Sequence, residues 1–422
     1  MKKYFLFYLI YLSLCNSFKA QNKSIQQDTV KLTIAEAEER FVKNNLSLLA
    51  DKYDIDIAKS KVLDAKLWNN PNLNYSQGLY DPHSGRYFDN SSTGTYNIQI
   101  QELFSIAGKH TNSVKLAKIN EKMSEWQFKD IIRSLKYQLY TDFNTILTNQ
   151  EQSKLYDYEI EKLNVLLSSM DQQKQLGVIP GNDIIRLKAE IEDLKNSSVQ
   201  NYNELLSTEK DIKILLNYNY GVYVVAIDGS DSNQTIPILS DLINTAENNR
   251  PDLQVSRSTI EYQMQNIKLQ RSLSVPDMTL GVWRDESGSY TNNLEEISLG
   301  FDLPLFNRNQ HQIKIAKYQL EQAKLNDSLQ QNTLENEVAQ AYSAYSNLNI
   351  QFNSKDKDYN HQLDDLNNDA ISNYSKRLIN LVDFLDQIRT FTTSRLSYYQ
   401  LKKQYQDAVN LLNFVTGTTI IK

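Results

Sequence analysis

The chain has 422 residues, of which 40% are hydrophobic and 23% are charged, and its formal net charge is −6. An isoelectric point near 5.5 excludes the basic character that nucleic-acid binding normally shows, so we expect no nucleic-acid partner. After the N-terminus, no apolar run reaches the roughly 18 residues that a membrane-spanning helix needs, which excludes that class of membrane protein.

The N-terminus has the pattern of an export signal. Lys2 and Lys3 precede an apolar segment from Tyr4 to Leu14, which is the order of positive and apolar regions in a secretory signal peptide. Ala20 is a suitable cleavage point, so residues 1–20 are predicted to be removed.

Cys15 is the only cysteine. A lipid anchor on Cys15 requires a small residue before it, and Leu14 is not small, so we favour a cleaved signal over a lipoprotein. After cleavage no thiol remains, and the mature chain has no disulfide.

Two long stretches, Lys109–Leu176 and Leu305–Thr416, contain neither Gly nor Pro. These residues cost roughly 1 and 3 kcal/mol in a helix interior, so their absence predicts long helices. The first helix is about 100 Å long at 1.5 Å per residue. The second stretch is expected to fold back near Asn373–Arg377, between a first arm from about Asn309 and a second arm from about Leu378.

Landmarks in the two halves of the chain recur at an offset of roughly 200 residues, which indicates a duplication. Examples are Pro71 with Pro276 and Asp183 with Asp383. We expect one repeat over residues 21–235 and a second over 236–422. Each repeat is predicted to run short helix, two strands, long helix, turn, short helix.

The short helices are predicted over about Thr33–Leu67 and Leu239–Leu273, and Thr33 with Glu36 has the spacing of a capping box. The strands lie within 70–104 and 276–306, where apolar residues alternate with small or polar ones. Between the first two strands, Tyr80–Gly94 is predicted to be a polar exposed loop.

Each strand is roughly ten residues long, which suits a tilted strand that crosses a bilayer. An ordinary half-buried hairpin of a soluble sheet is the alternative, but it must also explain export and the very long helices. Tyr and Trp side chains near the strands are expected at the membrane boundaries. These residues are Trp68, Tyr75, Tyr80, Tyr96, Trp283 and Tyr290.

Four strands from one chain cannot close a membrane barrel, because a closed barrel needs at least about eight. At least two chains must therefore contribute, and three provide twelve strands. The predicted fold class at this point is mainly α with a small β part, in which long helices packed side by side can form the wall of a cylinder.

Several short motifs lie in register within the duplication. They are Leu32-Thr33-Ile34-Ala35-Glu36-Ala37, Glu102-Leu103-Phe104 before Gly108-Lys109, Leu303-Pro304-Leu305-Phe306, and two hairpin tips, the first at Leu176–Asp183 and the second from Tyr374 through Asp386. With these motifs the sequence resembles the TolC-type outer-membrane factors, the outer membrane efflux protein family, from Leu32 to about Gly417. The segment around Leu103-Phe104 and Gly108-Lys109 is also similar to the heavy-metal-exporting branch with RND transporters.

The resemblance implies a homotrimer whose three chains share a twelve-stranded transmembrane β-barrel. This barrel spans the outer membrane, contacts its lipid and continues into the periplasm as a long α-helical barrel, a helical tunnel. It implies the exit duct of a tripartite efflux or secretion system. A periplasmic adaptor (membrane fusion) protein then couples this duct to an inner-membrane transporter.

The first hairpin tip resembles the family's adaptor-docking tip. The residues concerned are Gly177, Val178, Ile179, Pro180, Gly181 and Asp183. The alternative is a plain turn, since Gly and Pro dominate turns. The apolar Val178-Ile179 pair favours docking of a helical adaptor.

The second tip resembles the family's periplasmic gate. Asp383 and Asp386 are three residues apart on one helix face, so a trimer stacks them as two carboxylate rings, which favour cations at a constriction. Tyr374 matches the family's gate tyrosine, and Arg377 and Arg186 are candidate partners by proximity. The family usually has Gly where Arg377 stands. The alternative is that the two acidic residues simply complement the helix dipole.

No catalytic constellation and no phosphate-binding Gly-rich loop is recognisable, so we expect neither an enzyme nor a cofactor. The four histidines, His83, His110, His311 and His361, are far apart in sequence, and we expect no metal site. An exported coiled-coil protein or surface fibre without a channel is the alternative function. The strand pairs favour the channel, because a fibre does not need them.

Overall fold

The structure is a computed structural model that describes residues 28–82, 84–91, 93–176, 179–228, 238–287, 293–354 and 359–421. The predicted signal peptide and the site residues Gly177 and Val178 lie outside these ranges, as do His83 and Tyr290. The described chain forms two compact units, 28–44 with 145–228 and 45–144 with 238–421.

The first unit contains a parallel strand pair that the sequence pattern did not predict. Strand β1 (Asp28–Leu32) pairs with β6 (Val222–Ala226). Helix α2 (Ile34–Asn44) follows β1 and begins with the expected capping box, in which the Thr33 backbone N–H donates to Glu36 Oε2 at 2.8 Å.

A helical hairpin makes up most of the first unit. It consists of α4 (Lys109–Gln175) from Thr145 onward and α5 (Gly181–Leu215). Asn201 joins the two arms by donating to the Asn149 carbonyl at 3.0 Å and to Ser153 Oγ at 2.8 Å. The prediction of one unbroken helix over the first Gly- and Pro-free stretch is confirmed, because α4 has 67 residues.

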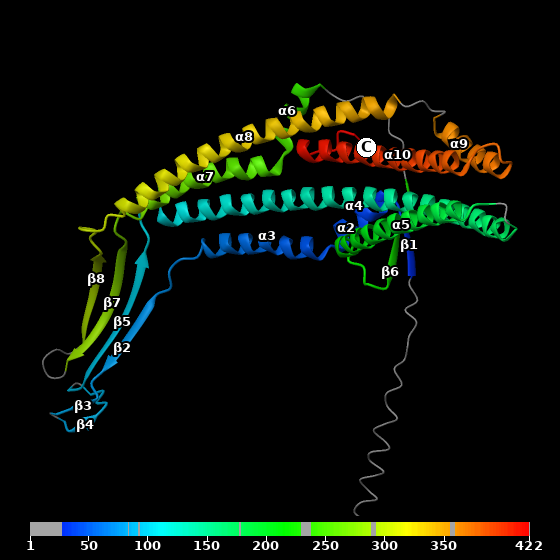
Figure 1. Cartoon of the computed structure of the whole chain (residues 1–422). Coiled ribbons are helices and arrows are strands. Elements are labelled where there is room, and N and C mark those ends of the chain that lie inside the picture. Colours follow the sequence, from blue (N-terminus) through cyan, green and yellow to red (C-terminus); the bar gives the residue numbers. More distant parts are fainter. Residues whose placement is uncertain are drawn as a thin grey trace, which may run out of the picture. The chain divides into compact units, whose positions relative to one another are not determined.

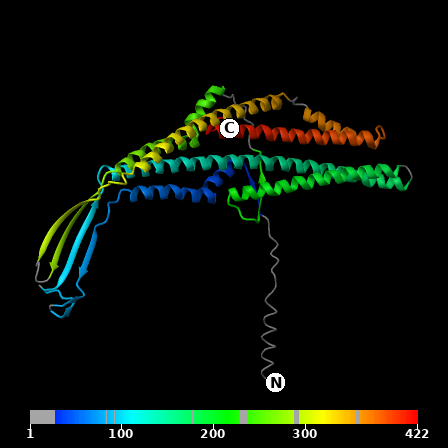
Figure 2. The same cartoon turned by 60° about the vertical axis from the view of Figure 1, so that its left-hand side comes forward.

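The second unit contains an antiparallel sheet of four strands in the order β2-β5-β7-β8. Its strands are β2 (Asn72–Gln77), β5 (Thr95–Phe104), β7 (Met278–Ser287) and β8 (Leu294–Phe301). They lie side by side in both views (Figures 1 and 2). All four fall within the predicted strand regions.

The segment predicted as a polar loop contains a small hairpin. Strands β3 (Tyr80–Asp81) and β4 (Arg86–Tyr87) pair with each other, and the rings of Tyr80 and Tyr87 lie 5.1 Å apart. An aromatic cross-strand pair of this kind stabilises even a very short ladder, which is why the loop prediction for this part was wrong.

The second unit, as described, contains six further helices, and α6 to α10 pack on one another. They are α3 (Leu46–Asp64), α6 (Leu239–Asn249), α7 (Pro251–Ser272), α8 (Gln310–Asn353), α9 (Tyr359–Ser375) and α10 (Leu381–Thr416). Helix α8 runs along α7 and then along α10 (Figure 1). Leu242, Leu253, Leu334, Val338 and Leu412 form the buried centre where α6, α7, α8 and α10 meet.

The arm predicted from about Asn309 to Asn373 is described as two helices, α8 and α9. Two shorter helices predicted as continuous are each interrupted once. Over Thr33–Leu67 the break is at Asn45, which is extended (φ −62°, ψ 120°) and caps α3 by accepting from the Leu48 N–H at 2.9 Å. Over Leu239–Leu273 the break is at Arg250 (φ −68°, ψ 119°), because a residue before proline avoids the α conformation. Both predictions of a single helix were therefore wrong.

Arg250 joins three helices at the second break and is only 3% exposed. It forms a bidentate ion pair with Asp252, with Nε–Oδ1 3.0 Å and Nη2–Oδ2 2.5 Å, and Nη1 reaches Glu337 of α8 at 2.5 Å. Arg133 of α4 adds a second cation 3.4 Å from Asp252. Burial opposes ionisation of Asp252, but its hydrogen bond to Arg250 and the charges of Arg250 and Arg133 hold its pKa below the ordinary value.

We predict that Arg250→Met lowers the unfolding free energy by about 3 kcal/mol, because it leaves Asp252 without its buried partner. A depressed pKa stabilises the fold above the ordinary Asp pKa near 3.9, and this contribution is lost as the pH falls through the lower folded value. The variant should therefore unfold at a lower temperature at neutral pH, with the difference from wild type shrinking in acid. Arg257→Met, at an exposed arginine of α7, is the control, and equal unfolding temperatures for both variants would contradict the prediction.

Candidate functional site

The sheet of the second unit has one apolar face. Directly paired residues of antiparallel strands point to the same side, and Ile100 is paired with both Leu73 and Val282. The apolar side chains on this face are Leu73, Tyr75, Ile98, Ile100, Leu280, Val282, Ile297, Leu299 and Phe301. The same registers place Glu102 on this face toward one end of the sheet, and Arg284 and Glu295 toward the other. Ile297 is 83% exposed, and no element described for this unit covers the face.

The opposite face of the sheet is polar and rich in amides. It carries Asn72, Asn74, Asn97, Gln99, Gln101, Thr279 and Ser298, together with Gly281 and Gly300. Trp283, which was expected at a membrane boundary, also lies on this face, because it is paired with Gln99. At Gly281 an added Cβ would lie 2.7 Å from Ser298 Oγ, so a larger residue there would displace this polar layer. A sheet with one apolar and one polar face is suited to lipid on one side and water on the other.

Both edges of this sheet are open within the described chain, because β2 and β8 each pair on one side only. Unpaired backbone N–H and C=O groups cost several kcal/mol each in hydrocarbon, so an open edge is not tolerated there. The described helices cannot take over the role of spanning a bilayer, since each of them is too short or too polar.

The helices joined to the two edge strands carry exposed apolar stripes. On α3 the stripe is Leu46, Leu49, Tyr53 and Ile57, and on α8 it is Ile315, Tyr318, Leu325 and Leu329. Each stripe lies about half a turn from the buried side of its helix, which includes Ala58 on α3 and Ala323 on α8. The spacings of three, four and seven residues in these stripes are those of helix-packing seams.

The first hairpin tip is apolar where it is described. Ile179 and Pro180 precede α5, and the Asp183 N–H bonds to the Pro180 carbonyl at 3.1 Å. Leu176 and Ile185 on either side are exposed. An added Cβ at Gly181 would make only an ordinary contact at 3.8 Å, so the structure does not require glycine there.

The second hairpin tip keeps a regular turn although Arg377 replaces the expected glycine. Arg377 adopts the left-handed conformation (φ 61°) that glycine usually takes after a helix. Its N–H bonds to the Tyr374 carbonyl at 2.9 Å, and the Leu378 N–H bonds to the Asn373 carbonyl at 2.8 Å. These two bonds form a Schellman motif, so the geometry of the turn is retained.

Of the predicted gate carboxylates, Asp383 lies in the first turn of α10 and Asp386 follows three residues later, and both are exposed. Asn380 caps this helix: its side chain accepts from the Asp383 N–H at 2.9 Å and donates to Asp383 Oδ2 at 2.8 Å. Asp383 thus has a local role at the helix start, whereas no such contact is described for Asp386. Tyr374 packs on Phe384 across the hairpin, with ring centroids 4.9 Å apart.

The structure therefore brings four of the five predicted gate residues to one hairpin end. Tyr374 and Arg377 end one arm, and Asp383 and Asp386 begin the other. Arg186 belongs to the first unit, where it lies exposed near the start of α5.

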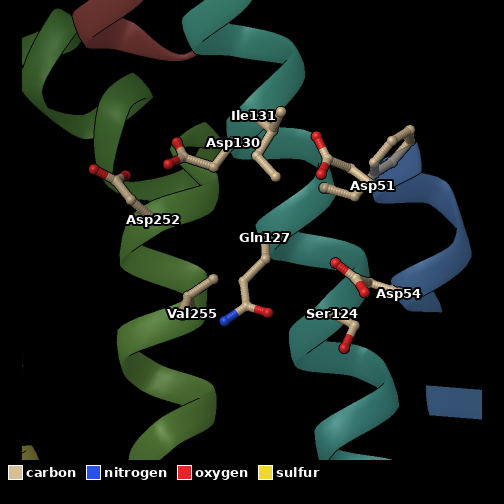
Figure 3. Close-up of a pocket in the computed structure, with 9 residues that line it drawn as sticks. Asp51, Asp54, Ser124, Gln127, Asp130, Ile131, Asp252 and Val255 are labelled. Atoms are coloured by element: carbon tan, nitrogen blue, oxygen red, sulfur yellow. The ribbon is translucent and has the colours of Figure 1, made fainter. Parts of the chain in front are cut away.

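A groove of about 390 Å³ between α3, α4 and α7 was not predicted from the sequence. Figure 3 shows Asp51 and Asp54 on one side, Asp252 and Val255 on the other, and Gln127 between them. Asp252 and the neighbouring Asp130 already form ion pairs with arginines. In the described ranges no group of three or more His, Cys, Asp or Glu side chains could hold a metal ion. The lining residues come from three distant segments, which no sequence motif connects.

Comparisons with known proteins agree with this architecture. A family model described as outer membrane efflux protein matches residues 242–418. Two curated relatives are similar. Toxin and drug export protein A of Aggregatibacter actinomycetemcomitans is 23% identical over 75% of this chain and 65% of its own length. Cobalt-zinc-cadmium resistance protein CzcC of Cupriavidus metallidurans is 19% identical over 92% of this chain and 90% of its own length. The crystal structure of the Campylobacter jejuni CmeC outer membrane channel has a TM-score of 0.77 at 16% identity, covering 92% of this chain and 86% of that one.

The two faces of the sheet predict opposite effects for neighbouring residues of β5. Ile100→Arg places a charge on the apolar face, which costs about 2–4 kcal/mol if that face meets the middle of a bilayer. We expect this variant to be depleted from the outer-membrane fraction. Gln99→Arg, on the polar face of the same strand, should accumulate there like the wild type. Equal amounts of both variants in the membrane would contradict the assignment of the faces.

Proposed function

The chain belongs to the outer membrane efflux protein family, and we propose that it is one subunit of a passive exit duct in a tripartite efflux or secretion system. The family and the fold are those of outer-membrane channels, whose members work with adaptor proteins and inner-membrane pumps and are typically trimeric. The observation that carries the proposal is the sheet with one apolar face, one polar face and two open edges.

Three chains are the smallest number that gives an open passage. An eight-stranded barrel, made of two chains, is filled by its own side chains, whereas twelve strands leave room for a channel. In this arrangement β2 of one chain pairs with β8 of the next, and the exposed stripe of α3 packs on that of α8. The same contact then repeats around a closed ring. A fibre would use the helical stripes but would have no need for the two-faced sheet.

The chain is proposed to consist of two structural repeats over residues 21–235 and 236–422. The described elements support this division, because two helices, two strands of the sheet and a long helical hairpin follow one another in each half. The strand regions are assigned to the membrane and the other helices to the periplasm.

The first hairpin tip, Gly177–Gly181 with Asp183, is proposed to dock the periplasmic adaptor. Support comes from the exposed apolar side chains of Leu176 and Ile185 beside it. Apolar side chains at a helical tip suit the insertion of a partner helix into a shared coiled coil.

The second tip is proposed to form the periplasmic gate. In a trimer, Asp383 and Asp386 contribute two rings of three carboxylates, and such rings at a constriction attract cations. Tyr374 positions the hairpin through Phe384. Arg377 and Arg186 are the proposed cationic partners that offset the repulsion within the rings.

The cargo is determined by the transporter, because a passive duct has no energy source of its own. The names of the two relatives refer to cobalt, zinc and cadmium resistance and to toxin and drug export. We propose a partner transporter of the RND type, as the resemblance to the heavy-metal branch implies.

Assembly can be tested on the stripe of α8. Leu329→Glu places a charge in the proposed seam, so it should reduce the trimer seen by native mass spectrometry in detergent and the channels formed in planar bilayers. Ser328→Glu adds the same charge one residue away and should assemble normally. Trimers of Leu329→Glu as abundant as those of Ser328→Glu would remove α8 from the interface.

The gate can be tested by removing charge without changing shape. The double variant Asp383→Asn/Asp386→Asn should conduct more than wild type in planar bilayers and lose cation preference, because ring repulsion and attraction for cations both disappear. Asp365→Asn/Asp369→Asn removes two exposed carboxylates from the other arm of the hairpin and serves as the control. Currents that are unchanged in the first variant would exclude these residues from the gate.

A further inference from the structure

The segment that leaves the sheet after β8 is apolar and exposed. Leu303 and Leu305 are 68% and 64% exposed, and Phe306 at 94% is the most exposed large hydrophobic side chain of the described chain. Leu303 and Leu305 follow Phe301 at intervals of two residues, so the apolar pattern of the last strand continues beyond its end.

The backbone of this segment is held in place by its own hydrogen bonds. The Leu305 N–H donates to the Leu303 carbonyl at 2.9 Å. Asn309 ends the segment in a left-handed conformation and donates from Nδ2 to the Gln270 carbonyl of α7 at 2.7 Å. The apolar side chains are thus presented outward from a fixed turn between the sheet and α8.

A cation follows the apolar side chains directly. Arg308 donates from Nε to the Leu305 carbonyl at 3.3 Å, which aligns the guanidinium with the turn. Within the described chain its two terminal nitrogens make no hydrogen bond or ion pair, and the side chain is exposed. The planar guanidinium matches the geometry of phosphate and can bind it through two parallel bonds.

The order of these groups matches that of a membrane boundary. The apolar face of the sheet comes first, then Leu303, Leu305 and Phe306, and then the Arg308 cation. A bilayer presents acyl chains, then an interface that aromatic side chains favour, then phosphates that attract cations. At the same end of the sheet, before β2, exposed Trp68 is stacked on His110 at 4.4 Å.

We propose that residues 303–308 form a phospholipid-binding collar, in which Leu303, Leu305 and Phe306 enter the bilayer boundary and Arg308 binds a lipid phosphate. The collar rests on the proposed function, because it takes the apolar face of the sheet as the surface that meets lipid. The proposal adds to that function a binding site at which the protein prefers particular phospholipid headgroups.

The depth of Phe306 can be measured by fluorescence. Phe306→Trp is prepared in the full chain with its three native tryptophans changed to Phe, and the trimer is placed in vesicles of phospholipid brominated near the headgroup. The collar predicts a loss of Trp fluorescence relative to unbrominated vesicles. Ile297→Trp, on the apolar face of the sheet, is the matched reference and should be quenched when the bromines are deeper in the acyl chains.

The two positions separate the collar from the function on which it rests. If Ile297→Trp is quenched and Phe306→Trp is not, the sheet meets lipid but a neighbouring copy covers the segment, and the collar is refuted. If neither is quenched, the membrane assignment of the sheet fails as well.

The role of Arg308 has a separate measurement. Phosphatidylglycerol added to the detergent-solubilised trimer should raise its unfolding temperature, whereas inorganic phosphate should not. Arg308→Gln should abolish the shift, and Arg271→Gln, at an exposed arginine at the end of α7, should keep it. An equal shift in both variants, or a shift with inorganic phosphate, would overturn the assignment of Arg308 to a lipid headgroup.

Discussion

Backbone hydrogen bonding in hydrocarbon is the constraint on which the rest of this structure depends. Water is absent from the core of a bilayer, so each N–H and C=O must find its partner within protein. The sheet β2-β5-β7-β8 satisfies its two inner strands and leaves one row of groups open on each outer strand. The sheet of one chain therefore has, within the described residues, two edges whose backbone groups lack partners. The apolar stripes of α3 and α8 are likewise exposed rather than packed.

The helices of this chain are regular over long distances and are interrupted at particular residues. Regularity comes from the lack of Gly and Pro in α4. The bends at Asn45 and Arg250 have nearly the same backbone angles but different causes, a side-chain cap in one case and a following proline in the other. At the second bend Gly417 is also needed, because a Cβ there would lie 3.0 Å from the Arg250 backbone nitrogen.

Much of this fold could be predicted from the sequence, because its strongest signals are local. The long stretch without Gly or Pro predicted α4, and the alternation of apolar with small or polar residues predicted the four strands of the sheet. The strands β1 and β6 were missed because each is five residues long and its partner lies nearly two hundred residues away. The break at Arg250 has a local signal in Pro251, because the residue before a proline avoids the α conformation.

Some site residues could likewise be placed from sequence spacing, whereas others could be placed only from the tertiary structure. Asp383 and Asp386 share a helix turn, which sequence spacing alone places correctly. The left-handed conformation of Arg377 does not follow from the preference of its residue type, and it accompanies the two backbone hydrogen bonds of the Schellman motif. The aspartate groove combines three helices, so only the tertiary structure assembles it.

The length of α4 has a consequence for how this chain can vary. Each residue of a helix turns the chain by about 100°, and 67 residues without Gly or Pro offer no loop to absorb an added one. A single insertion would therefore change the angular phase between the residues near Lys109 and those near Gln175. Changes of about seven or eleven residues, close to two or three full turns, keep that phase to within about 20°. The length of α4 can therefore change without altering the phase only in steps close to whole numbers of turns.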